Sequence, residues 1–255
     1  MKTKKNTQFI IAVFIIALTI SCSKDNTVST AGTVALKAKA TLNNTTGKDA
    51  ISAKGLSGLT ISSFITNIKN IEFDRNIEEN SSENSNLDED SNLSHSNDTY
   101  TNLELQGPFE LNLASGNTSI NVASANIPNN IFDEIQFELH KSTDPQSAIF
   151  GKSIEIKGDI NGTPFIFWTD AEEEMQINNS AANTNVVVNG STTTITINFD
   201  LSNIFGAATT IDFSKAVDGN NDGIIEISPD NIDGNADLAH TIKNLLEEGT
   251  DIEND

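Results

Sequence analysis

The segment 218–226 carries oxygen-bearing side chains at alternate positions, a spacing that suits a hard divalent cation. It reads Asp-Gly-Asn-Asn-Asp-Gly-Ile-Ile-Glu. In a calcium loop the side chains at positions 1, 3, 5 and 9 face one centre. The glycine at position 6 allows a sharp turn, and the carbonyl at position 7 is a further ligand. The residues in these places are Asp218, Asn220, Asp222, Glu226 and, through its carbonyl, Ile224. The segment therefore predicts a structural calcium ion, with a polar Asn/Gly turn as the alternative interpretation.

The twelfth position of the loop departs from this pattern. A calcium loop normally has a bidentate glutamate there, and this chain has Pro229, which has no side-chain ligand. Asp230 and Asp233, with Asp237 beyond them, are the carboxylates available to complete the shell. Soft metals are disfavoured, because the segment has no cluster of cysteine and histidine.

Other residues with chemical potential are scattered. The three histidines, His95, His140 and His240, lie in different sequence contexts, and none accompanies a nucleophile elbow. Paired carboxylates can hydrolyse glycosides, but the consecutive acids 172–174 on a strand would point to opposite faces. Trp168 is expected opposite the core residues Phe165 and Phe167, and one tryptophan makes a poor sugar platform. We therefore expect no catalytic residues and no enzymatic activity.

Cys22 is the only cysteine of the 255 residues, and it follows a segment with the layout of an export signal. Residues 1–21 begin with three lysines, continue as an uncharged apolar run and end on a small residue. The apolar run is too short for a membrane span, which needs about 20 residues. We expect residues 1–21 to be a lipoprotein signal peptide and Cys22 to be acylated, for example with palmitate. An ordinary secretory signal is the alternative.

The composition narrows the partners. Loss of the three signal lysines leaves 12 basic residues against 36 acidic ones, a formal net charge of −24. Nucleic acids are excluded as partners, since their binding depends on neutralisation of phosphates by lysine and arginine. A surface this acidic favours divalent cations and disfavours anionic lipid. The membrane is therefore expected to be reached only through the lipid on Cys22.

Alternating apolar residues predict a β domain. Residues 22–31 are small and polar and suit a tether, and the strand patterns fill 32–205. Two Asn-Gly pairs, at 161–162 and 189–190, stand between strand-like runs and predict hairpins. Residues 206–255 hold the calcium-type loop and a helix, indicated by apolar residues at helical spacing (Leu238, Ile242, Leu245 and Leu246). The sequence therefore predicts an all-β fold, an antiparallel β-sandwich with a calcium-type loop and one C-terminal helix.

The segment 76–102 interrupts the strand patterns. It is rich in Ser, Asn, Asp and Glu and has few apolar residues. Such a composition cannot bury enough surface to offset the entropy of ordering, so we expect a disordered acidic insertion in the β domain.

Several of the strand motifs together resemble a known family. The motifs are residues 64–73, 107–113, 127–128, 132–137 and 197–201. Their order resembles exported bacterial lipoproteins that carry a domain of unknown function with a prealbumin-like β-sandwich. The likeness covers about residues 32–205 and implies the fold and an envelope location, but no substrate. Ser23 after Cys22 resembles lipoproteins sorted to the outer membrane of Gram-negative bacteria.

Three functions follow from these observations. The favoured one is a lipid-anchored, non-enzymatic β-sandwich of the Gram-negative cell envelope that binds a protein partner or a glycan, with a structural calcium ion. The second is a structural or assembly subunit of a surface adhesin or fimbria-like polymer, in which a strand edge pairs with another chain. The third is a glycan hydrolase, which lacks support from any nucleophile or convergent base.

Overall fold

Strands make up most of the protein in a computed structural model, with 54% strand and 12% helix. The structure describes residues 30–42, 58–74, 103–113, 118–132, 134–178, 185–206 and 209–254. The predicted signal peptide, Cys22 and the acidic insertion lie outside these residues. Within the described part of the chain, no helix is both long and apolar enough to cross a bilayer.

The strands run from the N-terminal end of the described chain to its C-terminal end. They are β1 (Ala31–Thr41), β2 (Leu59–Asp74), β3 (Leu103–Leu105), β4 (Phe109–Asn112), β5 (Ile120–Pro128), β6 (Asn130–Phe132), β7 (Glu134–Leu139), β8 (Ile154–Ile160), β9 (Thr163–Thr169), β10 (Glu174–Asn178), β11 (Val186–Val188), β12 (Thr192–Asp200), β13 (Ile225–Ile227) and β14 (Thr250–Asn254). The helices are α1 (Ser202–Phe205), the 3-10 turn η2 (Phe213–Lys215) and α2 (Ala236–Glu248).

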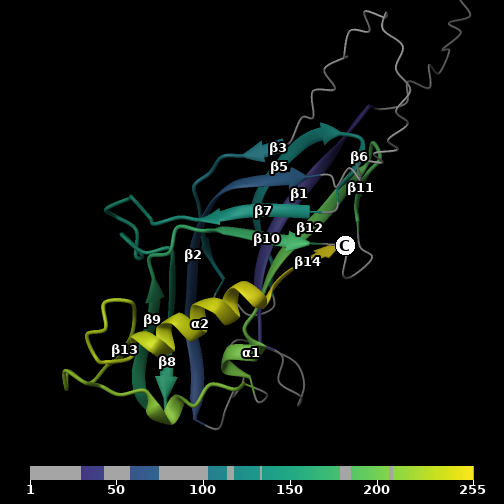
Figure 1. The fold of residues 1–255 in the computed structure, drawn as a ribbon. Helices are drawn as coiled ribbons and strands as arrows, with labels where there is room; N and C mark the ends of the chain where they lie inside the picture. Colours follow the sequence, from purple (N-terminus) through teal and green to yellow (C-terminus); the bar gives the residue numbers. More distant parts are fainter. Residues whose placement is uncertain are drawn as a thin grey trace, which may run out of the picture.

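The strands form two large sheets and one small sheet (Figure 1). The four-stranded sheet has the order β14-β12-β1-β5. The eight-stranded sheet has the order β10-β7-β2-β8-β9-β13, with β3 and β4 also paired to the long strand β2. The small sheet contains β11 and β6.

The expectation of purely antiparallel sheets is wrong for two strand pairs. β1 runs parallel to β12, and β13 runs parallel to β9. Both pairs join segments far apart in the chain, where no short turn dictates an antiparallel partner. Alternation of apolar residues specifies which face of a strand is buried, but it does not specify the direction of the neighbouring strand.

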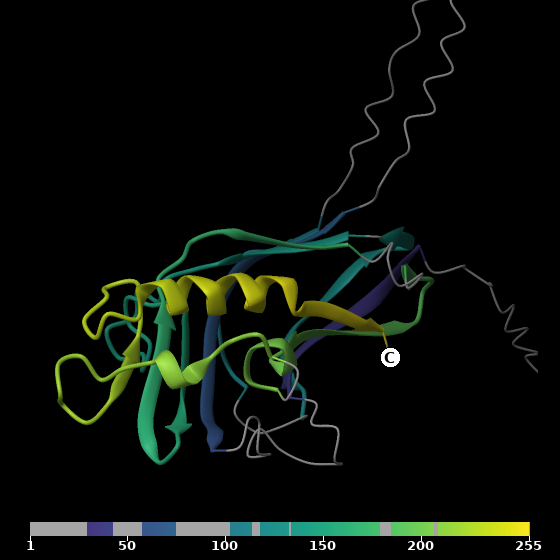
Figure 2. The same cartoon turned by 60° about the horizontal axis from the view of Figure 1, so that its bottom comes forward.

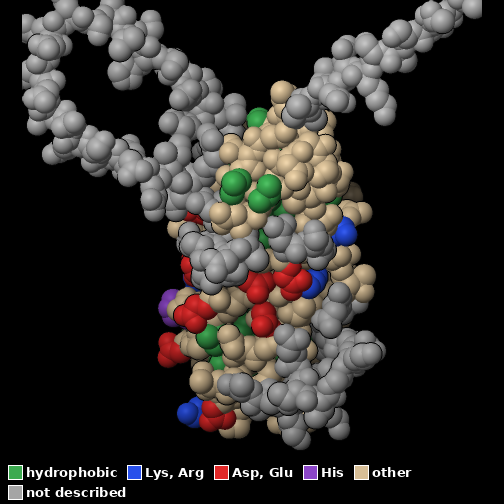
Figure 3. All heavy atoms as spheres, turned by 90° about the vertical axis from the view of Figure 1, so that its right-hand side faces the viewer, with side chains coloured by type: hydrophobic (Ala, Val, Ile, Leu, Met, Phe, Trp, Pro, Cys, Tyr) green, Lys and Arg blue, Asp and Glu red, His purple; other side chains and the backbone are tan. Residues whose placement is uncertain are grey.

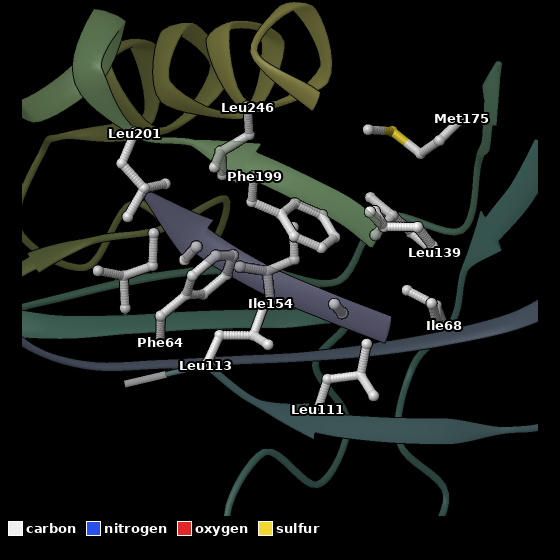
Figure 4. Packing of buried hydrophobic residues seen from close by; sticks show 14 of the residues in the cluster. Phe64, Ile68, Leu111, Leu113, Leu139, Ile154, Met175, Phe199, Leu201 and Leu246 are labelled. Carbon is white, nitrogen blue, oxygen red and sulfur yellow. The ribbon is translucent and has the colours of Figure 1, made fainter. Parts of the chain in front are cut away.

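The two large sheets share one apolar core. In β1, alternate residues from Val34 to Ala40 are buried. Phe199 of β12 meets Phe64 of β2 with ring centroids 5.5 Å apart and Phe137 of β7 at 6.2 Å, and both pairs are edge-to-face. Figure 4 shows Phe64 and Phe199 pointing towards each other between the sheets. Each such ring pair adds about 0.5–1.5 kcal/mol beyond burial of area, so these contacts fix how the sheets face each other.

The two Asn-Gly pairs have different outcomes. Asn161 and Gly162 have φ angles of 53° and 85°, and they join the antiparallel strands β8 and β9 in the predicted hairpin. At the second pair only Gly190 has a positive φ, 89°. A type I′ hairpin requires positive φ at both residues. The predicted second hairpin is therefore wrong in its pairing, and β11 forms its ladder with β6 instead of β12.

The predicted C-terminal helix is confirmed as α2, which buries Ala239, Ile242 and Leu246. It lies across the strands of the eight-stranded sheet (Figure 2) and contacts β9 and β13. The chain then returns to the four-stranded sheet, where β14 pairs with β12. Residues 206–254 thus add one strand to each large sheet, so that the loop at 218–226 is held at both ends by the β structure.

Candidate metal-binding loop

The loop 217–224 connects η2 to β13 and is organised by Asp218. Its two carboxylate oxygens accept hydrogen bonds from the backbone N–H groups of Asp222, at 3.1 Å, and Gly223, at 2.9 Å. Gly223 has a φ of 90°, which confirms the tight turn predicted for a glycine at this place. Asn221 also has a positive φ, 62°, a conformation that asparagine tolerates better than most residues. The local sequence therefore closes the turn around one carboxylate.

Asn220 and Asp222 lie against the same carboxylate. The Asp222 N–H that reaches Asp218 also donates to Oδ1 of Asn220, at 2.9 Å, so the two acceptor oxygens share one donor. The Asp222 carboxylate accepts from the Asn220 amide, at 3.0 Å, and from the backbone N–H of Ile224, at 2.9 Å. The structure thus brings together three of the predicted ligands, and all three offer oxygen atoms.

Glu226, the predicted ligand at position 9, has other partners. It lies in β13 between the core residues Ile225 and Ile227 and faces the opposite side of the sheet. Its Oε1 accepts hydrogen bonds from the indole Nε1 of Trp168, at 3.1 Å, and from the hydroxyl of Ser228, at 2.8 Å. Phe165 and Phe167 are buried and Trp168 is on the outer face, as expected. The Glu226 carboxylate therefore connects β13 to β9.

Asp233 holds the two ends of the loop together. Only 3% of its surface is exposed. Its Oδ1 accepts from the backbone N–H of Asn220, at 3.1 Å, and its Oδ2 from that of Glu226, at 2.7 Å. Since charged acceptors form stronger hydrogen bonds than neutral ones, this carboxylate is a main support of the loop. The sequence marked Asp233 only as a candidate ligand.

Asn235 is a supporting residue that the sequence analysis missed. Its side chain is buried and donates to the carbonyls of Val217 and Glu226, both at 2.8 Å, while its Oδ1 accepts from the Val217 N–H at 3.1 Å. It also stands just before the first turn of α2. The only local signal was an asparagine next to a helix start, which normally indicates a cap and not a link between distant carbonyls.

The full set of seven predicted ligands is not brought together. Asp230 is exposed, and Ile224 contributes a backbone N–H to the loop. In the part of the chain that the structure describes, no group of three or more Asp, Glu, His or Cys side chains is arranged to hold a metal ion. The gathered donors are two carboxylates and one amide oxygen, a chemistry that fits calcium. Calcium binding stays a prediction.

Comparison of the chain with protein-family models, with curated proteins and with solved structures finds no match. The resemblance to exported lipoproteins with a prealbumin-like domain therefore stays a prediction.

The other candidate groups lie apart from one another. His140 is 3.0 Å from Glu172, and His240 is 3.3 Å from Asn244 on the next turn of α2. The consecutive acids also separate, because Glu173 pairs with Lys243 at 2.6 Å and Glu174 enters β10. His95 lies outside the described residues. These groups form separate surface pairs.

A buried ion cluster on the outer face of β8 and β9 was not predicted. Glu155 is 1% exposed and lies directly across the strand pair from Trp168. Its carboxylate is 2.5 Å from the ammonium groups of Lys152 and Lys157, and the Lys152 nitrogen lies 5.4 Å from the centre of the Trp168 ring. A buried carboxylate persists when it is paired in this way. We interpret the cluster as structural support for β9 and, through Glu226, for β13.

Carboxylates crowd around Glu72 on β2. It lies opposite Glu104 of β3 and Gln136 of β7. Partial burial, together with Asp74, Glu104 and two further glutamates, raises the pKa of Glu72 above its ordinary value. A raised carboxylate pKa favours the folded state at low pH, and this contribution is lost as the pH rises through the folded-state pKa.

Glu72→Gln should therefore raise the melting temperature at pH 7, with a gain of about 0.5 kcal/mol, the scale of cross-strand charge pairs. The gain should shrink on addition of salt and vanish below the ordinary glutamate pKa of about 4.3. Thermal unfolding from pH 3.5 to pH 8 measures it. A gain that is constant over this range would show that charge is not its cause.

Proposed function

We propose that this chain is a lipid-anchored, non-enzymatic protein of the Gram-negative cell envelope, with a β-sandwich domain that binds a protein partner or a glycan. We also propose that a calcium ion in the 218–224 loop stabilises its C-terminal segment. The observation that carries the calcium proposal is that the N–H of Asp222 joins oxygens of Asp218 and Asn220 on one side of a tight turn. The packing of the two large sheets supports the sandwich interpretation.

The proposed calcium ion would be held by the side chains of Asp218, Asn220 and Asp222 and by the carbonyl of Ile224. Glu226 and Asp233 stand at the end of the loop, where one of their carboxylates would complete the shell. Bound calcium would neutralise charge in a loop that now has mainly backbone N–H groups as partners for its carboxylates. A rise in melting temperature with calcium tests this site, and Asp218→Ala combined with Asp222→Ala should remove the rise.

A hollow beside the loop supports the binding proposal. It has a volume of about 330 Å³ and is lined by Lys157, Asp159, Pro164, Ile166 and Ile224, among others. It combines exposed aliphatic surface with a charge of each sign, as recognition sites for small ligands do. Its position next to Ile224 would couple ligand binding to the order of the calcium loop.

Anchoring is tested at Cys22, because acylation needs its thiol. Cys22→Ala should move the protein from the membrane fraction to the soluble fraction or leave the uncut precursor. The measurement is fractionation of expressing cells, with mass determination of the N-terminus. The conservative variant Ser23→Ala should leave acylation intact. Normal membrane retention of a correctly cut Cys22→Ala protein would contradict the proposed anchor.

The polymer-subunit function is separated from the binding function by native mass spectrometry of detergent-released envelope complexes. A monomer that retains a glycan or a defined protein partner supports the proposal. A ladder of identical subunits would favour the adhesin or fimbria-like alternative, in which an edge strand of one copy pairs with the next. A glycan hydrolysis screen addresses the enzyme alternative.

A further inference from the structure

Two exposed aliphatic side chains form a patch on the small sheet. Ile131 of β6 and Val187 of β11 are direct partners in its antiparallel ladder and are 51% and 47% exposed. Their neighbours Val186, Val188 and Phe132 are buried, so the small sheet has an inner face on the core and an outer face towards solvent. Phe132 contacts Phe73 of β2 at 5.9 Å, which fixes the position of this sheet. Ile131 and Val187 are thus held outward by a rigid support.

The surroundings of this pair lack charge, although the protein as a whole is strongly acidic. Residues 30–36, 120–132 and 185–199 supply the strands at this end of the molecule, and none of them is charged. Figure 3 shows the same contrast, with uncharged atoms and a few hydrophobic side chains near the top and the acidic side chains lower down. An uncharged end with exposed aliphatic residues can approach an anionic membrane without the repulsion that the acidic surface would meet.

The chain enters the β structure at this same end. The backbone N–H of Asn129 donates to the carbonyl of Thr30, at 3.0 Å, and Ala31 pairs with Pro128. On the other side of β1, the Thr33 N–H donates to the carbonyl of Ser191, at 3.1 Å. Figure 1 places the start of β1 beside β6 and β11. Thr30 is therefore two residues from a partner of the patch, and its distance from Cys22 limits how far the patch can be from the lipid.

That limit is short. Eight residues separate Cys22 from Thr30, and a fully extended chain of this length spans at most about 28 Å. An acyl chain on Cys22 lies in the bilayer, so the N-terminal end of β1 is confined to this range of the membrane surface. Within it, the patch meets lipid at a high effective concentration, and weak apolar contacts suffice to orient the domain.

We infer that Ile131 and Val187 form a lipid-contact tip that inserts into the membrane interface and sets the orientation of the domain, with the 218–226 loop directed away from the bilayer. This inference rests on the proposed acylation of Cys22. The occupant of the patch is the lipid surface, because the uncharged end and the short anchored chain both bring lipid to it.

The test uses the acylated full-length protein with one new thiol. Acylation blocks the sulfur of Cys22, so a maleimide derivative of the dye NBD labels only the new cysteine in Ile131→Cys, Val187→Cys or the matched control Ile232→Cys. Ile232 is equally exposed, at 54%, and lies in the C-terminal segment after β13. The proteins are placed in vesicles of phosphatidylethanolamine and phosphatidylglycerol, with and without nitroxide-labelled lipid, which quenches the dye on contact.

The expected result is a blue shift of NBD emission and quenching by the nitroxide lipid at positions 131 and 187, with neither effect at 232. Unquenched dye at 131 and 187 in vesicle-bound protein would overturn the lipid-contact tip and leave acylation intact. A blue shift without quenching would assign the patch to a second copy of the chain and would also overturn it. A mass without acyl groups would contradict the anchoring itself, and the inference would fall with it.

Discussion

Asp233→Ala should lower the free energy of unfolding by about 3 kcal/mol or more. The carboxylate is buried and accepts hydrogen bonds from the backbone N–H groups of Asn220 and Glu226. A hydrogen bond to a charged group contributes about 1.5–3 kcal/mol, and removal of the acceptor leaves both donors without it. The Glu226 N–H lies in β13, so the loss should loosen the attachment of this strand to β9. Urea denaturation measures the change.

The matched control is Asp230→Ala, which removes an exposed aspartate three residues earlier. It should change the free energy of unfolding by no more than about 0.5 kcal/mol, as most surface substitutions do. Asp233→Asn should fall between the two variants, because its amide retains one acceptor oxygen. Equal urea midpoints for Asp233→Ala and Asp230→Ala would show that Asp233 does not support the loop.

Gly158→Ala should destabilise the protein by about 3 kcal/mol, the upper part of the usual range for overpacking. A Cβ at this position of β8 would lie 1.8 Å from the carbonyl oxygen of Thr60 in β2 and 2.8 Å from the ring of Phe165. The oxygen belongs to the backbone, so it cannot move away without displacing β2. The substitution should therefore weaken the pairing of β2 with β8 next to its bulge. Thermal unfolding measures the loss.

Gly162→Asn is the control for this variant. Gly162 is in the β8–β9 turn, where a Cβ would meet nothing within 4 Å and φ is +85°. Asparagine tolerates this left-handed conformation, so the cost should stay below about 1 kcal/mol. If Gly158→Ala melts at the same temperature as Gly162→Asn, the close approach of β2 and β8 is not present in the protein.

The sequence predicted elements whose signals are local. The alternation in β1 and β12 and the helical spacing in α2 reflect one buried face each, and a window of ten residues contains this information. The parallel pairing of β1 with β12 and the ladder of β11 with β6 join segments far apart, and no local pattern encodes such partners. The short strands β13 and β14 were missed because three to five residues give too little alternation to recognise.

The candidate site divides in the same way. Asp218, Asn220 and Asp222 come together because their spacing is part of one turn, and Gly223 adopts the positive φ that the turn needs. Glu226 belongs to a strand, so its direction is set by Trp168, a residue 58 positions earlier that no spacing rule includes. Asp233 and Asn235 act on backbone groups of distant segments, and only the tertiary structure shows these partners.

The most direct test of the account is calcium binding by the unmodified protein, measured by isothermal titration and by thermal unfolding in calcium or in chelator. We expect one weak site, in the range of about 10⁻⁴–10⁻³ M typical of extracellular modules. At 100 times its dissociation constant, calcium should stabilise the fold by about 2.7 kcal/mol. Asp218→Ala combined with Asp222→Ala should lose both the binding heat and the stabilisation while remaining folded. Identical melting curves in calcium and chelator, with no binding heat, would contradict the account and leave the loop as a polar turn.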